Sequence, residues 1–168
     1  MRGHRDTWRI LRKQIGNEKY VWFHAASLGE FEQGRPLIER LRREHPEKKI
    51  LLTFFSPSGY EVRKNYEGAD VVCYLPLDTP LNARKFVRLA NPEAAYFIKY
   101  EFWRNYIDVL HQKHIPVYSV SSIFRPNQIF FRWYGRNYAR VLQRMTHLYV
   151  QNEESRALLA TIGVDHVT

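Results

Sequence analysis

The fold is decided by residues 20–45, which read YVWFHAASLGEFEQGRPLIERLRREH. Tyr20–Ala25 is an apolar run of strand length, and Glu30–His45 has apolar positions at helical spacing, ended by Pro46. A buried strand followed directly by an amphipathic helix is the first half of a β-α-β unit. In such a unit the turn between strand and helix is where ligands bind.

The same alternation of strand and helix continues along the chain. The predicted strands are Tyr20–Ala25, Lys49–Phe54, Asp70–Leu75, Ala94–Lys99, Pro116–Val120 and Thr146–Val150. The predicted helices are Glu30–His45, a segment that includes Tyr60–Tyr66, Pro80–Leu89 with a cap at Asp78 or Thr79, Phe102–His111, Asn127–Gln143 with a break at Gly135, and Asn152–Thr161. No element is predicted before Tyr20.

One helix between consecutive strands implies right-handed crossovers and a parallel sheet covered on both faces. The sequence therefore predicts an α/β fold, a Rossmann-like doubly wound parallel sheet, over residues 1–168. The segment VDHVT after Gly163 has the pattern of another strand. From this we expect a longer protein in which a second domain follows.

The composition narrows the functional classes. The chain has 168 residues, of which 45% are hydrophobic, and this is enough for a packed core. A single cysteine, Cys73, argues against a disulfide framework and a cysteine-rich zinc site, and a reducing cytoplasm is the expected compartment. The net charge of +9 favours a phosphate-bearing partner such as nucleic acid, anionic lipid or nucleotide. No apolar run reaches the length of a membrane span.

The turn after the first strand has two interpretations. Ser27 and Glu30 have the spacing of a capping box, in which each side chain satisfies the other residue's backbone amide. Alternatively, Glu30 is a general base at the mouth of the sheet, and Gly29 allows a ligand close to the backbone. The helix N-terminus favours the ionised carboxylate, so Glu30 would orient a hydroxyl and accept its proton late.

Two further strand ends carry candidate binding residues. Ser56, Ser58 and Gly59 begin a helix, either as an anion site or as a serine cap followed by a proline. Lys99 and Glu101 follow the fourth strand. Glu101 would accept hydrogen bonds from a sugar or position a cation, or it simply begins a helix.

The segment 121–140, SSIFRPNQIFFRWYGRNYAR, interleaves aromatic and basic residues. This pattern suits a membrane interface, single-stranded nucleic acid, or a core helix with a basic face. The residues predicted to contact lipid are Phe130, Phe131, Arg132, Trp133 and Arg136. The histidines lack metal-ligand spacing, and neither common phosphate-loop motif is present, so no metal is predicted.

Five segments in order resemble the N-terminal domain of the 3-deoxy-D-manno-octulosonic acid (Kdo) transferase family of lipopolysaccharide synthesis. They are VWFHAASLGEFEQGRPLIERL, ILLTFFSPSGYE, YLPLDTPLNARKF, KYEFWRNY and VQNEESRALLATIGV, and the resemblance covers residues 8–168. The motif A-S-x-G-E-F, at Ala26 to Phe31, is the most specific of them.

The resemblance implies one half of a two-domain glycosyltransferase of the GT-B fold. The N-terminal domain would bind a lipid A precursor, and a C-terminal domain would bind the donor CMP-Kdo without any cofactor or metal. Glu30 would be the catalytic base and Glu101 a second important glutamate, with Ser27, Gly29, Ser56 and Lys99 as acceptor-side neighbours.

The resemblance also implies a location on the cytoplasmic face of the bacterial inner membrane, with an apolar N-terminal anchor that we expect to be missing from this chain. This chain alone is not expected to catalyse transfer. The alternatives are a basic nucleic-acid-binding domain, or a GT-B enzyme acting on another lipid. With the resemblance, no nucleic acid partner is expected.

Overall fold

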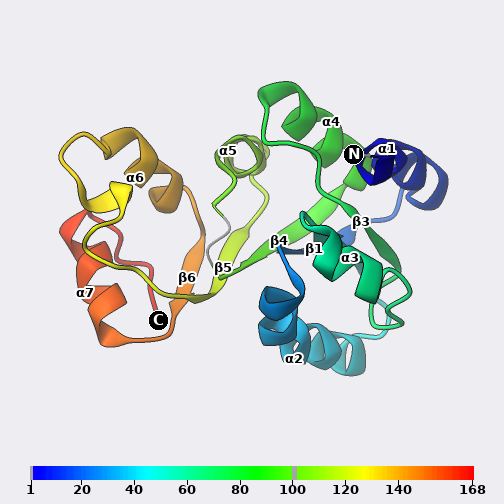
Figure 1. Cartoon of the computed structure of the whole chain (residues 1–168), viewed down its shortest axis with the longest axis horizontal. Helices are drawn as coiled ribbons and strands as arrows, with labels where there is room; N and C mark the ends of the chain where they lie inside the picture. The colour runs from blue at the N-terminus through cyan, green and yellow to red at the C-terminus, as the bar shows by residue number, and fades with distance from the viewer. Residues whose placement is uncertain (1, 100–101) are drawn as a thin grey trace.

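The computed structural model describes residues 2–99 and 102–168, and it consists of a parallel sheet between two layers of helices (Figure 1). The strands are β1 Tyr20–Ala25, β2 Lys49–Phe54, β3 Val71–Tyr74, β4 Pro92–Ile98, β5 Val117–Ser122 and β6 His147–Val150. The helices are α1 Arg2–Gln14, α2 Leu28–Glu44, α3 Pro57–Arg63, α4 Pro80–Ala90, α5 Arg104–Gln112, α6 Arg136–Gln143 and α7 Glu153–Thr161, with a short 3₁₀ helix, η1, at Ile129–Phe131.

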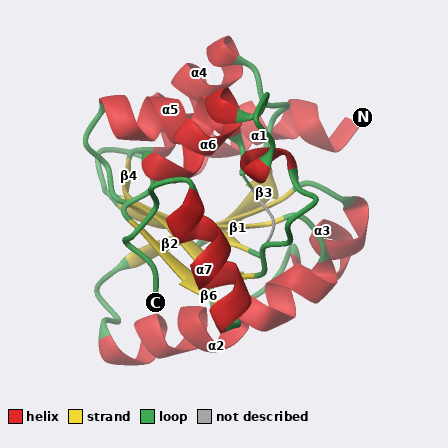
Figure 2. Ribbon diagram, turned by 90° about the vertical axis from the view of Figure 1, so that its left-hand side faces the viewer, coloured by secondary structure: helices red, strands yellow, loops and turns green. Residues whose placement is uncertain are grey.

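The strand order is β3-β2-β1-β4-β5-β6, and every pairing among these strands is parallel. The chain moves outward from β1 in one direction and then crosses to β4 to move outward in the other. Helices α2 and α3 therefore lie on one face, and α1, α4, α5 and α6 on the opposite face (Figures 1 and 2). The predicted α/β doubly wound fold is confirmed, and the carboxyl ends of the strands share one edge.

An apolar core lies between the sheet and each layer of helices. Strand β1 contributes to both cores because its side chains alternate between the two faces of the sheet. Trp22 lies in the larger core beneath α4 and α5, whereas Phe23 lies in the smaller core beneath α2. Both side chains are buried. A strand buried on both sides has an almost continuous apolar sequence, as Tyr20–Ala25 has.

Helix α1 was not predicted from the sequence. This helix packs on the larger core through Leu11 and the following Ile15, and the buried Thr7 hydroxyl donates to the carbonyl of Tyr74 at 2.8 Å. Thr7, Leu11 and Ile15 are spaced by four residues and form a narrow stripe in a charged sequence. A threonine within so narrow a stripe gives a weak helical signal.

The predicted helix Asn127–Gln143 is wrong in its first half. Only η1 and α6 are helical in this segment, and Arg132 between them is extended, with ψ 148°. Gly135 is buried, and a Cβ atom built there would lie 1.7 Å from the carbonyl oxygen of Ile129. The predicted break at Gly135 is confirmed, since α6 begins at the next residue.

The segment after Gly163 forms the predicted start of another strand. Val167 makes an isolated parallel bridge with Leu148 of β6, and the N–H of Thr168 donates to the carbonyl of Leu148 at 3.0 Å. Gly163 itself has φ +76°, a left-handed conformation that favours glycine after α7.

Candidate active site at the carboxyl edge of the sheet

The loops that follow β1 and β2 are joined through Ala26. Its carbonyl oxygen accepts from the N–H of Ser56 at 2.8 Å and from the N–H of Phe55 at 3.3 Å. These bonds bring Ser27 and Ser56, which are distant in sequence, to one edge of the sheet. The two serine-containing turns therefore lie next to each other at this edge, as predicted.

Glu30 lies in the first turn of α2 and is half-buried. Its Oε2 accepts from the backbone N–H of Ala26 at 2.8 Å, so the carboxylate is turned back over the end of β1. Ser27 is the N-cap residue, but its side chain makes no capping hydrogen bond. The capping-box prediction is wrong, because Glu30 binds one residue earlier than a capping box requires and Ser27 does not reciprocate.

Gly29 is exposed at the same turn. A Cβ atom built on Gly29 has nothing within 4 Å, so no contact inside the described part of the protein requires a glycine here. Open space beside the carboxylate is what a ligand approaching the backbone would need.

Ser56 occupies the N-cap of α3 with Pro57 in the first turn, as predicted. Its hydroxyl makes no capping bond and instead lies 2.8 Å from the hydroxyl of Ser58. The hydroxyls of Ser56 and Ser58 thus form a polar pair beside the Ala26 loop. A polar pair of this kind suits an anion and a sugar hydroxyl equally well.

Lys99 follows β4, the strand next to β1, and has φ +63°. Its N–H donates to the carbonyl of Val120 at 2.7 Å, and its carbonyl accepts from the Ser122 hydroxyl at 3.0 Å. The main chain of Lys99 is therefore fixed at the same edge as Glu30. The second predicted glutamate, Glu101, lies outside the described residues.

An aromatic group near this edge was not predicted. The rings of His24 and Trp103 are 4.9 Å apart, and those of Phe55 and Trp103 are 5.2 Å apart. His24 is fully buried, with Nδ1 2.8 Å from the hydroxyl oxygen of Thr53, which also accepts from the Trp22 indole. A polar residue at a core position of β1 is the signal in the sequence that could have revealed this group.

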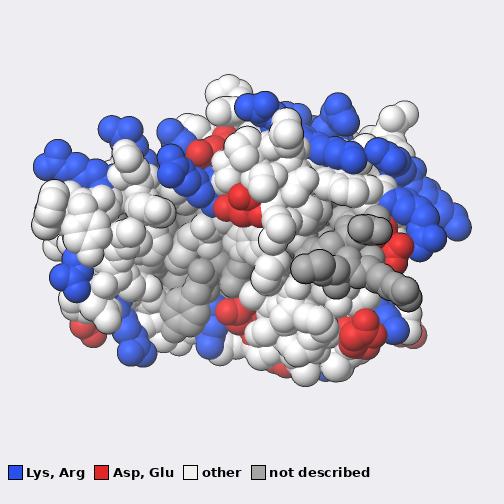
Figure 3. Space-filling view, turned by 45° about the horizontal axis from the view of Figure 1, so that its top comes forward, with Lys and Arg blue, Asp and Glu red and all other residues white. Residues whose placement is uncertain are grey.

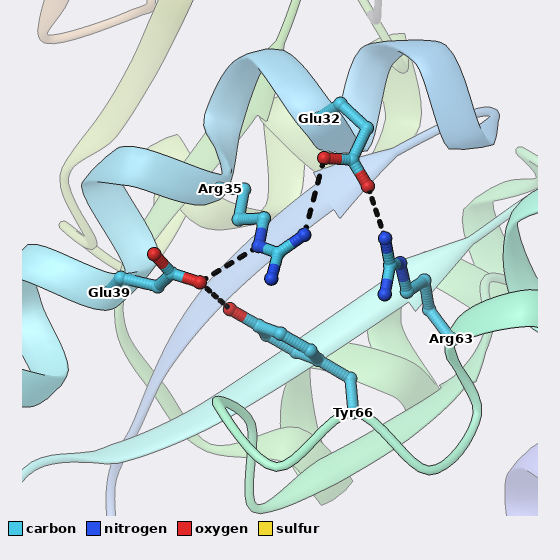
Figure 4. Close-up of polar contacts among 5 residues, drawn as sticks. All are labelled: Glu32, Arg35, Glu39, Arg63 and Tyr66. Carbon is cyan, nitrogen blue, oxygen red and sulfur yellow. Dashed lines mark hydrogen bonds and ion pairs between the residues drawn. The ribbon is translucent and has the colours of Figure 1, made fainter.

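Helices α2 and α3 are connected by a network of charged and polar side chains (Figure 4). The Glu32 carboxylate pairs with Arg63 at the end of α3 at 2.6 Å and with Arg35 at 3.5 Å. Glu39 accepts from Arg35 at 2.8 Å and from the Tyr66 hydroxyl at 3.2 Å. This network holds α3 against α2. It thereby also fixes the relative position of the two loops that meet at Ala26, because each loop leads into one of these helices.

The hydrogen bond from Arg63 lowers the pKa of Glu32, and the charges of Arg63 and Arg35 act in the same direction despite partial desolvation. The hydrogen bond from Arg35 likewise lowers the pKa of Glu39. Both carboxylates are therefore ionised at neutral pH and available to the arginines.

The predicted lipid-contact residues lie together at η1 and the start of α6. Phe130 and Phe131 are partly buried against the core, where Phe130 packs on Phe102 and Phe124. Trp133, in contrast, is 86% exposed, and Arg132 and Arg136 are exposed beside it. All five residues line a hollow of about 580 Å³ between η1, α6 and α7.

Metal sites and membrane spans are both absent from the described residues. In residues 2–99 and 102–168 no group of three or more histidine, cysteine, aspartate or glutamate side chains has the arrangement of a metal site. Over the same ranges no helix combines the length and apolar character needed to cross a bilayer.

The parallel sheet, with helices on both faces and a polar carboxyl edge, defines a Rossmann-like α/β domain. Two solved structures share the fold: a putative UDP-N-acetylglucosamine 2-epimerase from Listeria monocytogenes and a UDP-GlcNAc 2-epimerase from Neisseria meningitidis bound to UDP-GlcNAc. Each aligns with a TM-score of 0.63, at 11% and 12% identity, over 90% and 89% of this chain and 44% and 45% of the other.

The family is shown by sequence. Residues 5–168 match the family model described as 3-deoxy-D-manno-octulosonic-acid transferase (kdotransferase), and the chain belongs to this family. The 3-deoxy-D-manno-octulosonic acid transferase of Aquifex aeolicus is 40% identical over 88 residues, which are 52% of this chain and 24% of the relative. That of Chlamydia trachomatis serovar D is 28% identical over 97% of this chain and 41% of the relative. The chain thus spans between a quarter and about two fifths of these relatives.

Proposed function

We propose that this chain is the acceptor-binding, base-bearing domain of a glycosyltransferase that moves Kdo from CMP-Kdo to a lipid A precursor. Membership of the family supports the reaction class, and the relatives are named for Kdo transfer. The donor would be bound mainly by a C-terminal domain of the full-length protein, in the GT-B arrangement, and no cofactor is proposed.

The observation that carries the proposal is the position of the Glu30 carboxylate. It is held by the Ala26 N–H over the end of β1, at the edge where open α/β sheets bind ligands. A fixed carboxylate there can accept the proton of an attacking hydroxyl without reorganising. Lys99 and Ser56 lie at the same edge and are proposed as acceptor contacts, together with Glu101.

In the proposed step the acceptor hydroxyl oxygen bonds to the anomeric carbon of Kdo. The bond from that carbon to the CMP phosphate oxygen breaks, and CMP leaves with the electron pair. The hydroxyl proton passes to Glu30. By analogy with glycoside hydrolysis, the carbon passes through an oxocarbenium-like state, so Glu30 acts late, once the attacking oxygen has become acidic.

The charge distribution supports an acceptor in an anionic membrane. Lys and Arg side chains gather along the upper rim of the molecule in Figure 3, and the Asp and Glu side chains on this face lie mostly below them. With the net charge of +9, this surface would attract phosphorylated lipid on the cytoplasmic face of a bacterial inner membrane. We propose the Trp133 region as the part that enters the headgroup layer.

The test uses the full-length protein with CMP-Kdo and a tetra-acylated lipid A precursor, and mass spectrometry of the lipid product. The proposal predicts addition of Kdo mass and release of CMP. Transfer from a UDP-sugar and none from CMP-Kdo would instead identify another glycosyltransferase. Steeply salt-dependent RNA binding without transfer would favour the nucleic-acid alternative.

A further inference from the structure

A second polar group lies at the same edge of the sheet, at the ends of β5 and β6. Gln151 follows β6, and its backbone N–H donates to the carbonyl of Ser122 at 2.9 Å. Its side-chain Nε2 donates to the carbonyl of Ser121 at 2.7 Å and lies 3.5 Å from Oε1 of Gln33 on α2. The Gln151 amide therefore connects two strand ends with the helix that carries Glu30.

Gln33 reaches Gln151 because α2 lies close to the sheet. A Cβ atom on Gly34 would be 2.1 Å from Cδ1 of Ile98, so the helix could not approach β4 this closely with a larger residue. Gln33 is three residues after Glu30, and residues at this spacing share a helix face. The exposed amide of Gln33 is thus one helical turn from the proposed base, and the Gln151 amide lies beside that of Gln33.

The backbone at this edge is strained. Ser121 has φ +59° and Lys99 has φ +63°, in the left-handed region that only glycine adopts readily. Ser121 sits where the register between β5 and β6 shifts. Strained residues persist when their surroundings fix them, and they concentrate at binding and catalytic sites.

Specific polar bonds fix both strained residues. The Gln151 amide holds the carbonyl of Ser121, and the hydroxyl of Ser122 holds the carbonyl of Lys99. Ser122 is fully buried and also hydrogen-bonds the hydroxyl of Ser119, which is equally buried. A chain of buried hydroxyls is costly unless satisfied, and here it maintains the shape of the edge beside Glu30.

We propose that Gln33 and Gln151 form a subsite that binds hydroxyl groups of the acceptor sugar and orients the attacking hydroxyl toward Glu30. An amide both donates and accepts hydrogen bonds, which matches a sugar hydroxyl, whereas an uncharged amide has no preference for phosphate. Asn152, the residue after Gln151, lines a hollow of about 580 Å³ with residues 123–127. This inference rests on the proposed function.

The experiment measures initial rates of the full-length enzyme against acceptor and donor separately, for Gln33→Ala, Gln151→Ala and the double variant. Gln143→Ala is the matched control, because Gln143 is exposed on α6 and its amide donates to the carbonyl of Ile162 at 2.9 Å, away from this edge. Melting temperatures identify any variant that is damaged. Gln33→Ala is the variant that leaves the Ser121 contact intact, so its effect reports on the ligand.

We expect Gln33→Ala to raise the acceptor KM by roughly threefold to tenfold, the effect of one hydrogen bond, with the donor KM and kcat changed by less. Gln151→Ala should raise the acceptor KM further, and Gln143→Ala should leave the acceptor KM unchanged. An unchanged acceptor KM in a folded Gln33→Ala enzyme, or an equal rise in both KM values, overturns the subsite while Kdo transfer stands. A wild-type enzyme without Kdo transfer overturns both proposals.

Discussion

Gly29 provides a residue-level test that separates binding from stability. It is exposed in the first turn of α2, and no atom lies within 4 Å of the position that a Cβ atom would take. Because alanine is a better helix former, Gly29→Ala should leave stability unchanged or raise it by up to ~1 kcal/mol. If the acceptor approaches this backbone, the added methyl group should lower kcat/KM by roughly tenfold.

Gly34→Ala is the control for this prediction. A Cβ atom there overlaps the Ile98 side chain, so the variant should be destabilised by about 1–3 kcal/mol. Urea denaturation and acceptor kinetics on both variants distinguish the two roles. Full activity in Gly29→Ala would show that no ligand passes close to this turn.

At the scale of elements, the contact between α2 and α3 should depend on pH. The folded-state pKa of Glu32 lies below its unfolded value, chiefly through the hydrogen bond from Arg63. Its contribution to stability is therefore fully present above the unfolded pKa of ~4.3 and is lost as the pH falls through the folded pKa.

Glu32→Gln should accordingly lower the urea midpoint at pH 7, and the difference from wild type should shrink as the pH falls below about 4. Both side chains are partly exposed, so the difference should also shrink in about 1 M salt. A difference that stays constant over the whole acid titration would show that the loss comes from packing and not from the ion pair.

The six strands were predictable because each is an apolar run between turn residues, and their pairing follows from one helix per crossover. The common edge of Glu30, Ser56 and Lys99 follows from the same topology. In contrast, α1 buries only a narrow stripe, and residues 127–135 are shaped by Phe130, Phe131 and Gly135 packing against other parts of the chain. Packing against distant parts of the chain leaves no pattern in the local sequence from which it could be predicted.

The amide pair could not be predicted from the sequence. Gln33 and Gln151 are exposed, lie 118 residues apart, and belong to no motif by residue type. Their proximity depends on how closely α2 approaches β4 at Gly34, which is a property of tertiary packing. The buried role of His24 was missed for a related reason, since its partners are on β2 and in the segment before α5.

At the scale of the whole molecule, the exposed basic and aromatic surface predicts membrane binding. Trp133 is the side chain to change, because it is 86% exposed, whereas Phe130 and Phe131 support the core. Trp133→Ser should weaken binding to anionic vesicles by roughly tenfold, and Arg132→Gln with Arg136→Gln should reduce it further and lower its salt dependence.

Leu81→Ser is the control for the vesicle experiment, since Leu81 is 75% exposed on α4. Sedimentation with vesicles of neutral and of anionic lipid measures both the apolar and the electrostatic contribution. Equal binding by wild type and by the Trp133 and arginine variants, all folded, would exclude this region as the docking surface.

The carboxylate of Glu30 is proposed to serve as the base of Kdo transfer. The most direct test is the rate of transfer from CMP-Kdo by the full-length wild-type enzyme and by its Glu30→Gln variant. Glu44→Gln is the control, because Glu44 lies at the far end of α2 and pairs with Arg40 on the surface. Glutamine retains an oxygen for the Ala26 N–H, so Glu30→Gln should fold normally and lose a factor of roughly 10² to 10⁴ in kcat, while Glu44→Gln keeps full activity. A folded Glu30→Gln enzyme that transfers Kdo at the wild-type rate would contradict the claim and leave Glu30 as a residue that only fixes the turn.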